Sequence, residues 1–273
     1  MLQRIQETNW EKVTTGWMYL DYFLGGGMKA STLTSFIASG KVGKTYFITN
    51  WVYRLIREQI PVYFFSAEMG AGVTAARMMQ LMYQKSWRQI EEDFNTRNYD
   101  PYCGGIDYLE KFCVIDPTSP LPVEYVASQI QKFSGQCKYF FIDHHMKMTI
   151  ENKRGIYDEI TGIMNTLYQV SQQVNSRIVV VIQARRQTGS RVPAGSVMPQ
   201  MSHGKGSGSI ELNADAVITM CNPGLFLEEC DLDKKDGIFV QLRPGRYHIG
   251  APPPVFIPYN KATSELIEVK RIF

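Results

Sequence analysis

The sequence lacks the features that would place it among membrane, secreted or strongly charged proteins. It has no run of about 18 apolar residues, so we expect no membrane-spanning helix. Residues 1–13 carry charges where a secretory signal peptide needs an apolar run, so we do not expect export. The 29 basic and 26 acidic residues leave a net charge of only +3, so any nucleic-acid site must come from a local cluster of cations.

Cysteine and histidine are also scarce. The five cysteines form no C-x-x-C pair, and the four histidines do not have the spacing of zinc ligands. We therefore expect reduced, mostly structural thiols, which are typical of the cytoplasm. The predicted localisation is the cytoplasm, or the host cytoplasm if a phage or plasmid encodes the chain.

What the sequence does have is an alternation of strand-like and helical patterns. The strand-like runs are continuously apolar, as in a parallel sheet that is covered on both faces. These runs span 33–38, 62–66, 112–115, 139–143, 178–183, 214–220 and 238–242, and the helical patterns span 44–57, 73–84, 122–133 and 156–174. This order predicts an α/β fold with a doubly wound, mainly parallel central sheet and helices on both faces.

The pattern changes after Met220. Strand-like runs with turn residues at 236–237 and 244–245 follow one another without helices, so we expect an antiparallel C-terminal edge. Two segments, 147–155 and 185–209, have the composition of irregular loops, and a loop as long as the second is usually functional. We expect one domain over residues 14–273, preceded by a short N-terminal arm or truncated linker helix over residues 1–13.

The most specific local signal is a phosphate-binding loop, Ala38-Ser39-Gly40-Lys41-Val42-Gly43-Lys44-Thr45, between a predicted strand and a predicted helix. Backbone N–H groups of such a loop point at the β-phosphate. The Lys44 ammonium is expected to reach the β- and γ-phosphates of ATP, and the Thr45 hydroxyl to ligate Mg²⁺. Gly43 allows close approach of the backbone, whereas Ala38 replaces the usual first glycine.

Three further polar residues end predicted strands, where ligands bind in sheets of this kind. Asp143 ends an apolar run and is the candidate second ligand of Mg²⁺. Glu68 can polarise the water that attacks the γ-phosphate, or it can be a solvated glutamate favoured by a helix dipole. Gln183 can hydrogen-bond the γ-phosphate, or it can simply cap its strand. Spacing alone leaves both of these pairs of alternatives open.

Motifs outside the phosphate loop carry a family resemblance. The most specific is Ser207-Gly208-Ser209-Ile210-Glu211 followed by Ala214-Asp215. The others are Thr15-Gly16-Trp17 with Leu20-Asp21, Ser66-x-Glu68-Met69 with a later Arg77, and Gln241-x-Arg243-x-Gly245. Together they resemble the RecA-like motor domain of DnaB-type hexameric replicative helicases, and the resemblance covers nearly the whole chain.

The resemblance implies an enzyme, a replicative DNA helicase motor domain. Such a domain hydrolyses ATP at subunit interfaces to translocate on single-stranded DNA and unwind duplex. It implies a homo-oligomer, a hexameric ring whose assembly could need ATP or DNA, with a primase or loader protein as a further partner. Arg243 would be the arginine finger that reaches a neighbouring site, Glu68 would activate water, and Gln183 would be the sensor glutamine.

The chain departs from this family at several positions. Gln241 stands where the family has lysine, and His144 and His145 follow the Walker B aspartate where it usually has tyrosine and an apolar residue. The adjacent histidines fit local packing better than a metal site. We expect only the short arm before the motor, without the N-terminal collar or primase domain that members of the family carry.

The resemblance also assigns the DNA contacts, since the family places them on loops that correspond to the two irregular segments. Both segments have a local excess of cations, the second also has several glycines and no acidic residue, and this composition suits sequence-independent binding of phosphates. The candidates are Lys153, Arg154, Arg185, Arg186, Arg191 and Lys205.

Two other functions fit the same residues. One is a RecA-like or KaiC-like DNA-binding ATPase, a recombination or loading mediator without unwinding activity. The other is an ATP-gated assembly module that hydrolyses poorly, which Ala38 and Gln241 would explain.

Overall fold

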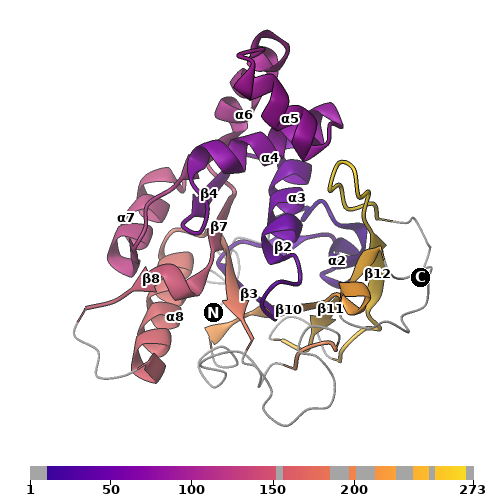
Figure 1. Ribbon diagram of the computed structural model, residues 1–273. Helices are drawn as coiled ribbons and strands as arrows, with labels where there is room; N and C mark the ends of the chain where they lie inside the picture. The colour runs from indigo at the N-terminus through magenta and orange to yellow at the C-terminus, as the bar shows by residue number, and fades with distance from the viewer. Residues whose placement is uncertain are drawn as a thin grey trace.

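The computed structural model describes residues 11–151, 156–184, 197–200, 213–225, 236–245 and 250–268. Its centre is an eight-stranded sheet in the order β12-β11-β10-β3-β9-β7-β4-β5 (Figure 1). The strands are β3 (Thr32–Ala38), β4 (Val62–Ser66), β5 (Cys113–Asp116), β7 (Tyr139–Asp143), β9 (Arg177–Gln183), β10 (Ala216–Cys221), β11 (Gly237–Arg243) and β12 (Val255–Pro258). The pairs from β10 to β5 are parallel, while β11 and β12 are antiparallel to their neighbours. The predicted parallel sheet and antiparallel edge are therefore confirmed.

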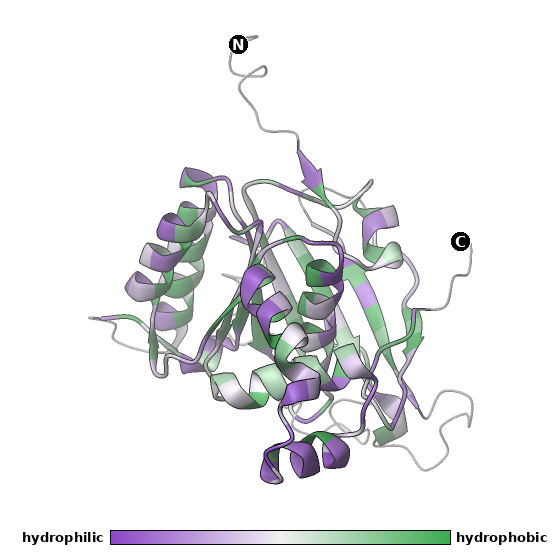
Figure 2. Ribbon diagram, turned by 90° about the horizontal axis from the view of Figure 1, so that it is seen from above, coloured by the Kyte–Doolittle hydropathy of each residue, from purple (hydrophilic) through white to green (hydrophobic). Residues whose placement is uncertain are grey.

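Helices cover both faces of the sheet. The helices are α2 (Met18–Phe23), α3 (Lys44–Arg57), α4 (Ala71–Tyr83), α5 (Trp87–Asn95), α6 (Cys103–Phe112), α7 (Val123–Phe133) and α8 (Ile156–Gln173). One apolar core packs α2, α3, α4 and α6 against one face, and a second packs α7 and α8 against the other. Figure 2 shows the apolar strands enclosed between helices whose outer surfaces are polar. This arrangement explains why the central strands are apolar without alternation.

Aromatic side chains join α3 to the sheet. Phe47 stacks between Phe36 of β3 and Trp17, with ring centroids 4.8 and 4.9 Å away. Trp51, one turn later, meets Phe141 of β7 edge to face at 5.3 Å. These buried contacts fix the helix whose first turn carries the phosphate loop, so the loop is set on a rigid part of the core.

The carboxyl ends of the parallel strands meet at one edge of the sheet. Ala38 of β3 pairs with Gln183 of β9, and Ser66 of β4 pairs with Asp143 of β7. The phosphate loop follows Ala38 directly, and Glu68 lies two residues after Ser66. The register therefore brings all four predicted functional segments to this edge.

Several small elements were not predicted. α5 is mostly polar and buries only Ile90; a capping box at Ser86 and a Lys85–Asp93 ion pair of 2.7 Å hold it. Its apolar residues Trp87, Ile90 and Phe94 follow helical spacing, but the element is too short and too polar for the sequence pattern to stand out. Together, α4, α5 and α6 form the protrusion at the top of Figure 1.

The predicted N-terminal arm and first irregular loop each contain short regular structure. β1 (Lys12–Val13) pairs with β2 (Met28–Lys29), so the described end of the arm is a strand, while residues 1–10 lie outside the described part. Lys147 ends a 3-10 turn, η2 (His145–Lys147), and β8 (Met148–Thr149) pairs with β6 (Leu121–Pro122). Two more 3-10 turns are η1 (Asp100–Tyr102) and η4 (Pro223–Leu225). Among the described helices, none is long and apolar enough to cross a membrane.

Candidate active site

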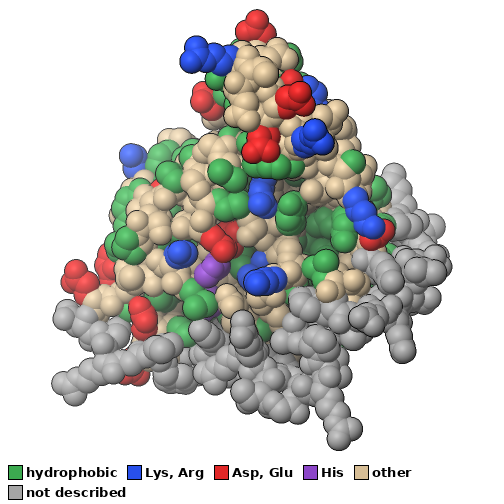
Figure 3. Space-filling model, viewed as in Figure 1, with side chains coloured by type: hydrophobic (Ala, Val, Ile, Leu, Met, Phe, Trp, Pro, Cys, Tyr) green, Lys and Arg blue, Asp and Glu red, His purple; other side chains and the backbone are tan. Residues whose placement is uncertain are grey.

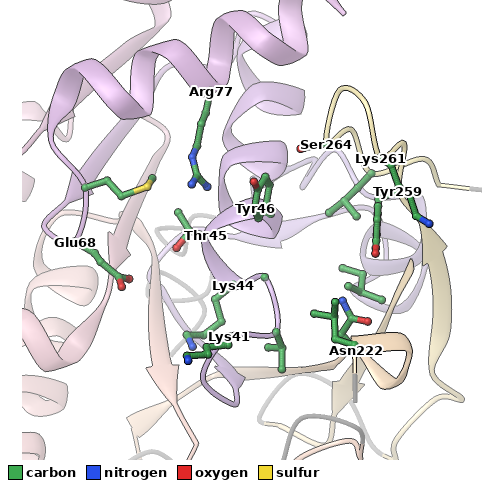
Figure 4. A pocket seen from close by; sticks show the side chains of 16 residues that line it. Lys41, Lys44, Thr45, Tyr46, Glu68, Arg77, Asn222, Tyr259, Lys261 and Ser264 are labelled. Atoms are coloured by element: carbon green, nitrogen blue, oxygen red, sulfur yellow. The ribbon is translucent and has the colours of Figure 1, made fainter. Parts of the chain in front are cut away.

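A cavity of about 700 Å³ opens at the carboxyl edge of the sheet. Its lining comes from the phosphate loop, the start of α3, α4 and the C-terminal strands (Figure 4). The lining residues are Lys41, Val42, Gly43, Lys44, Thr45, Tyr46, Glu68, Met69, Arg77, Asn222, Leu225, Ile238, Tyr259, Lys261, Ser264 and Leu266. Figure 3 shows basic, acidic and histidine side chains gathered on this face, below the helical protrusion.

The phosphate loop has the backbone that its sequence predicts. Gly43 is the N-cap of α3 and has φ of 95°, a left-handed conformation that favours glycine. The first turn of a fourteen-residue helix therefore faces the cavity, with the partial positive charge of its free N–H groups. Lys44 is buried, and its ammonium donates a hydrogen bond to the carbonyl of Ser39 at 2.8 Å. Burial lowers the pKa of Lys44, and the carboxylates of Asp143 and Glu68 oppose that shift.

Asp143 lies beside the loop, as expected of a metal ligand. Its side chain is only 1% exposed, and burial raises its pKa to about 6 despite a hydrogen bond from Thr45 and the nearby cations Lys44 and Arg77. Its Oδ1 atom is buried and accepts no hydrogen bond from the described residues. A divalent cation would occupy that acceptor and offset the cost of burying the charge. Thr45 and Asp143 thus fit a Mg²⁺ ion, which prefers oxygen ligands.

Glu68 follows β4 and lines the same cavity. Its side chain is 47% exposed, and its Oε2 atom lies 3.4 Å from Nε2 of His144. Figure 4 places its carboxylate on one side of Lys44 and Thr45, with Asn222 and Tyr259 on the other. Because α4 begins at Ala71, Glu68 precedes the helix and is not part of its first turn. The position therefore favours the role in the cavity over the helix-dipole alternative.

Gln183 lies against the phosphate loop. Its side-chain Nε2 would be 3.5 Å from a Cβ atom at Gly40, so the amide approaches the loop closely. The backbone N–H of Ala184 donates to the carbonyl of Ala38 at 2.9 Å, which extends the pairing of β9 with β3 to the end of Gln183. The structure therefore brings Lys44, at the start of α3, to the same sheet edge as Asp143, Glu68 and Gln183, which lie at or just after the ends of three neighbouring strands.

Comparison with known families decides the identity. Residues 12–247 match the model of the DnaB-like helicase C terminal domain. The chain belongs to the DnaB-like helicase family. It is a C-terminal ATPase domain of that family and binds nucleotide.

Solved structures show the same fold. One, described as "The Structure Of A DnaB-Like Replicative Helicase And Its Interactions With Primase", superposes with a TM-score of 0.81 at 17% identity over 98% of this chain. This chain covers 66% of that longer protein. Another, the "ATPase Domain of G40P", gives a TM-score of 0.81 at 16% identity, with 98% of this chain and 96% of that one covered. No curated protein matches the sequence.

The helicase domain also has site residues that sequence reasoning did not assign. Arg77 points from α4 toward Thr45 (Figure 4), with its guanidinium over the Tyr46 ring at 4.6 Å. Its Nε atom is buried and has no hydrogen-bond partner among the described residues. Its spacing from Glu68 was the signal that could have assigned it. Tyr259 and Lys261 have no such signal, because only the fold brings the C-terminal segment to the cavity.

Arg243 occupies a different part of the helicase domain. On β11, Arg243 pairs with Val217 of β10. Three residues further along β10, Met220 pairs with Ala38 at the edge of the sheet where the cavity opens. Arg243 is therefore three residues short of that edge and does not line its own cavity. Its guanidinium donates to the hydroxyl of Thr219 at 3.1 Å and to the carbonyl of Pro199 at 2.8 Å.

The predicted nucleic-acid contacts lie outside the described residues. These are Lys153, Arg154, Arg185, Arg186, Arg191 and Lys205. The motif 207–211 lies there as well, so these assignments remain predictions.

Proposed function

We propose that this domain hydrolyses ATP with Mg²⁺ and uses the energy to move on single-stranded DNA and unwind duplex, as the motor of a cytoplasmic replicative helicase. The supporting observation is that Lys44, Thr45 and Glu68 line one cavity at the carboxyl edge of the sheet, while the buried Asp143 lies behind them, hydrogen-bonded to Thr45 and close to Lys44. Cation, metal ligand and acidic group are the set that phosphoryl transfer to water requires.

Each residue has a separate task in this proposal. Lys44 and the N–H groups of the loop bind the β- and γ-phosphates and stabilise the charge that develops there. Thr45 and Asp143 would hold Mg²⁺, which would supply positive charge to offset that of the phosphate groups. Glu68 orients the attacking water and polarises it, and Gln183 hydrogen-bonds the γ-phosphate.

The cavity also has a half that suits a nucleobase. Tyr46, Leu225 and Tyr259 line it with apolar or aromatic surface, and Asn222 and Ser264 add polar groups. A base can stack on such rings and find hydrogen-bond partners at the rim. The two halves together suit a nucleoside triphosphate.

Arg243 is assigned to a neighbouring subunit's site. It is absent from its own cavity lining and lies on the antiparallel edge, so a second copy must approach for it to meet a phosphate. We extend this to a homo-oligomer, a hexameric ring that can require ATP or DNA to form. A primase or loader protein is a further partner, by analogy with the matched helicase that interacts with primase.

The test is DNA-stimulated ATP hydrolysis by wild type, Lys44→Ala and Glu68→Gln. Lys111→Ala and Glu91→Gln are matched controls, because both residues are exposed on the helical protrusion. Both site variants should lose turnover, and the controls should keep it. Unchanged turnover in Lys44→Ala would contradict the proposal. Strand displacement on a forked duplex then separates a helicase from a DNA-binding ATPase that does not unwind.

A further inference from the structure

We propose that His144 is the residue that positions Glu68 for hydrolysis, by donating a hydrogen bond from its Nε2 atom. The inference rests on the proposed function, in which Glu68 orients the attacking water. It gives a role to an adjacent histidine pair, His144-His145, that the phosphate site does not otherwise use.

Glu68 needs such a partner because its own surroundings do not fix it. It lies between the end of β4 and the start of α4, and nearly half of its side chain is exposed. A glutamate in that setting samples several rotamers, and each rotamer moves the carboxylate away from a single water position. The 3.4 Å approach of His144 Nε2 to Glu68 Oε2 is the contact that selects one of them.

The hydrogen-bonding of the ring determines which nitrogen faces Glu68 as a donor. The backbone N–H of Met146 donates to Nδ1 of His144 at 3.2 Å, so Nδ1 acts as an acceptor. A neutral imidazole that accepts at one nitrogen carries its proton on the other. The proton is therefore on Nε2, the atom that faces the carboxylate.

The ring is held by a rigid frame. Its side chain is only 8% exposed, and its backbone carbonyl accepts a hydrogen bond from Lys147 N–H at 2.9 Å, which closes the turn η2. His145 is buried and fastens this turn to β9, with Nδ1 3.2 Å from the Val181 carbonyl and 3.4 Å from the Gln183 backbone nitrogen. Because the His144 ring is held in place, a hydrogen bond from it can hold the Glu68 carboxylate in one orientation before the reaction.

The histidine pair therefore connects two parts of the site. His144 reaches Glu68 beyond β4, and His145 reaches the backbone of Gln183 on β9. Packing accounts for His145, as the sequence suggested. It does not account for the orientation of His144 toward the cavity carboxylate.

The test compares His144→Phe, which keeps a ring but has no donor, with His144→Gln, whose amide nitrogen can replace Nε2. His144→Phe should lower kcat for DNA-stimulated ATP hydrolysis about 10- to 100-fold, the scale expected for a misplaced reacting group, with KM and nucleotide affinity nearly unchanged. His144→Gln should recover most of the loss. His144→Asn has an amide that is too short to reach Glu68, so it should lose kcat as His144→Phe does. It serves as a second test of the missing donor if His144→Phe folds poorly. Met146→Leu, on the same turn, is the control that keeps wild-type kcat.

A double-mutant cycle separates positioning from general stability. In a Glu68→Gln background, His144→Phe should cause no further loss of kcat. Full kcat in His144→Phe and His144→Asn, no recovery in His144→Gln, or an undiminished loss in the Glu68→Gln background would each overturn the inference. If Lys44→Ala and Glu68→Gln abolish turnover while both donor-less variants keep it, the proposed function stands and only this inference fails.

Discussion

The two halves of the sheet carry functional residues in different ways. In the parallel half, β3, β9, β7 and β4 each deliver a residue to one edge, so Lys44, Gln183, Asp143 and Glu68 meet within one chain. In the antiparallel half, β11 holds Arg243 away from that edge, hydrogen-bonded to Thr219 and Pro199. The parallel half therefore gathers its candidate residues within one chain. The antiparallel half holds Arg243 outside its own cavity, and under the proposed function a second copy would use it.

The largest effect should come from the antiparallel half. Arg243→Ala should lower kcat about 10³- to 10⁵-fold, the range for an arginine finger, and leave nucleotide binding nearly intact. Binding is measured by titration with a fluorescent nucleotide, and turnover by phosphate release. An equal loss of binding would mean that Arg243 acts within its own subunit.

Glu68→Gln should have the next largest effect. Loss of the group that activates water should lower kcat about 10²- to 10⁴-fold, while the amide still fits the cavity. Nucleotide affinity should stay within a few-fold of wild type. A wild-type kcat would leave only the solvated, structural role for this residue.

The buried Asp143, in the parallel half of the sheet, should lower the free energy of unfolding of the ligand-free protein once its carboxyl is ionised. Burial raises its pKa from 3.8 to about 6, so the unfolded chain ionises first and the free protein loses stability as pH rises from about 4 to 6. Above pH 6, Asp143→Asn should therefore be more stable than wild type without ligand, by at most about 3 kcal/mol.

Denaturant titrations from pH 4 to pH 8 measure that difference, with the exposed Asp107→Asn on α6 as control. The gap should open between about pH 4 and 6 and then stay constant. Nucleotide with Mg²⁺ should reverse it, because the ligand offsets the buried charge only in wild type. A gap that is constant over the whole range would contradict the assigned pKa.

The smallest effect concerns DNA. Lys205→Ala should weaken single-stranded DNA binding modestly. It should also reduce the slope of log K against log salt concentration by about 1, the amount expected for the loss of one phosphate contact. Fluorescence anisotropy at several salt concentrations measures the slope. An unchanged slope would remove Lys205 from the DNA path.

The sequence was sufficient to predict the strands and site residues of the parallel half of the sheet. It was not sufficient to predict the strand order or several of the helices. Apolar runs that end in Asp143 and Gln183 are local signals, and the phosphate loop between strand and helix is another. Strand order was not predictable, because it depends on which crossovers pack. The helices α2, α5 and α6 were not predicted, and α4 begins at Ala71, two residues before the predicted start, because the small residues Ala71 and Gly72 carry no apolar signal.

Parts of the site depend on tertiary structure alone. Tyr259 reaches the cavity only because β12 pairs with β11, and no local pattern indicates that. The His144 contact with Glu68 joins residues on two different strand ends, and adjacent histidines in a sequence give no direction for either ring. The spacing of residues along the chain therefore predicts which of them lie at the carboxyl edge of the sheet. Only the packed structure shows which side chains contact each other there.

Mixing two inactive variants tests the shared site most directly. A Lys44→Ala copy retains Arg243, and an Arg243→Ala copy retains a complete phosphate loop, so a junction between them forms one intact site. Equimolar mixing with single-stranded DNA should give ATP turnover well above the sum of the two separate variants. A mixture no more active than that sum, while the copies still co-assemble, would contradict the claim that one chain's loop and another chain's arginine form the active site.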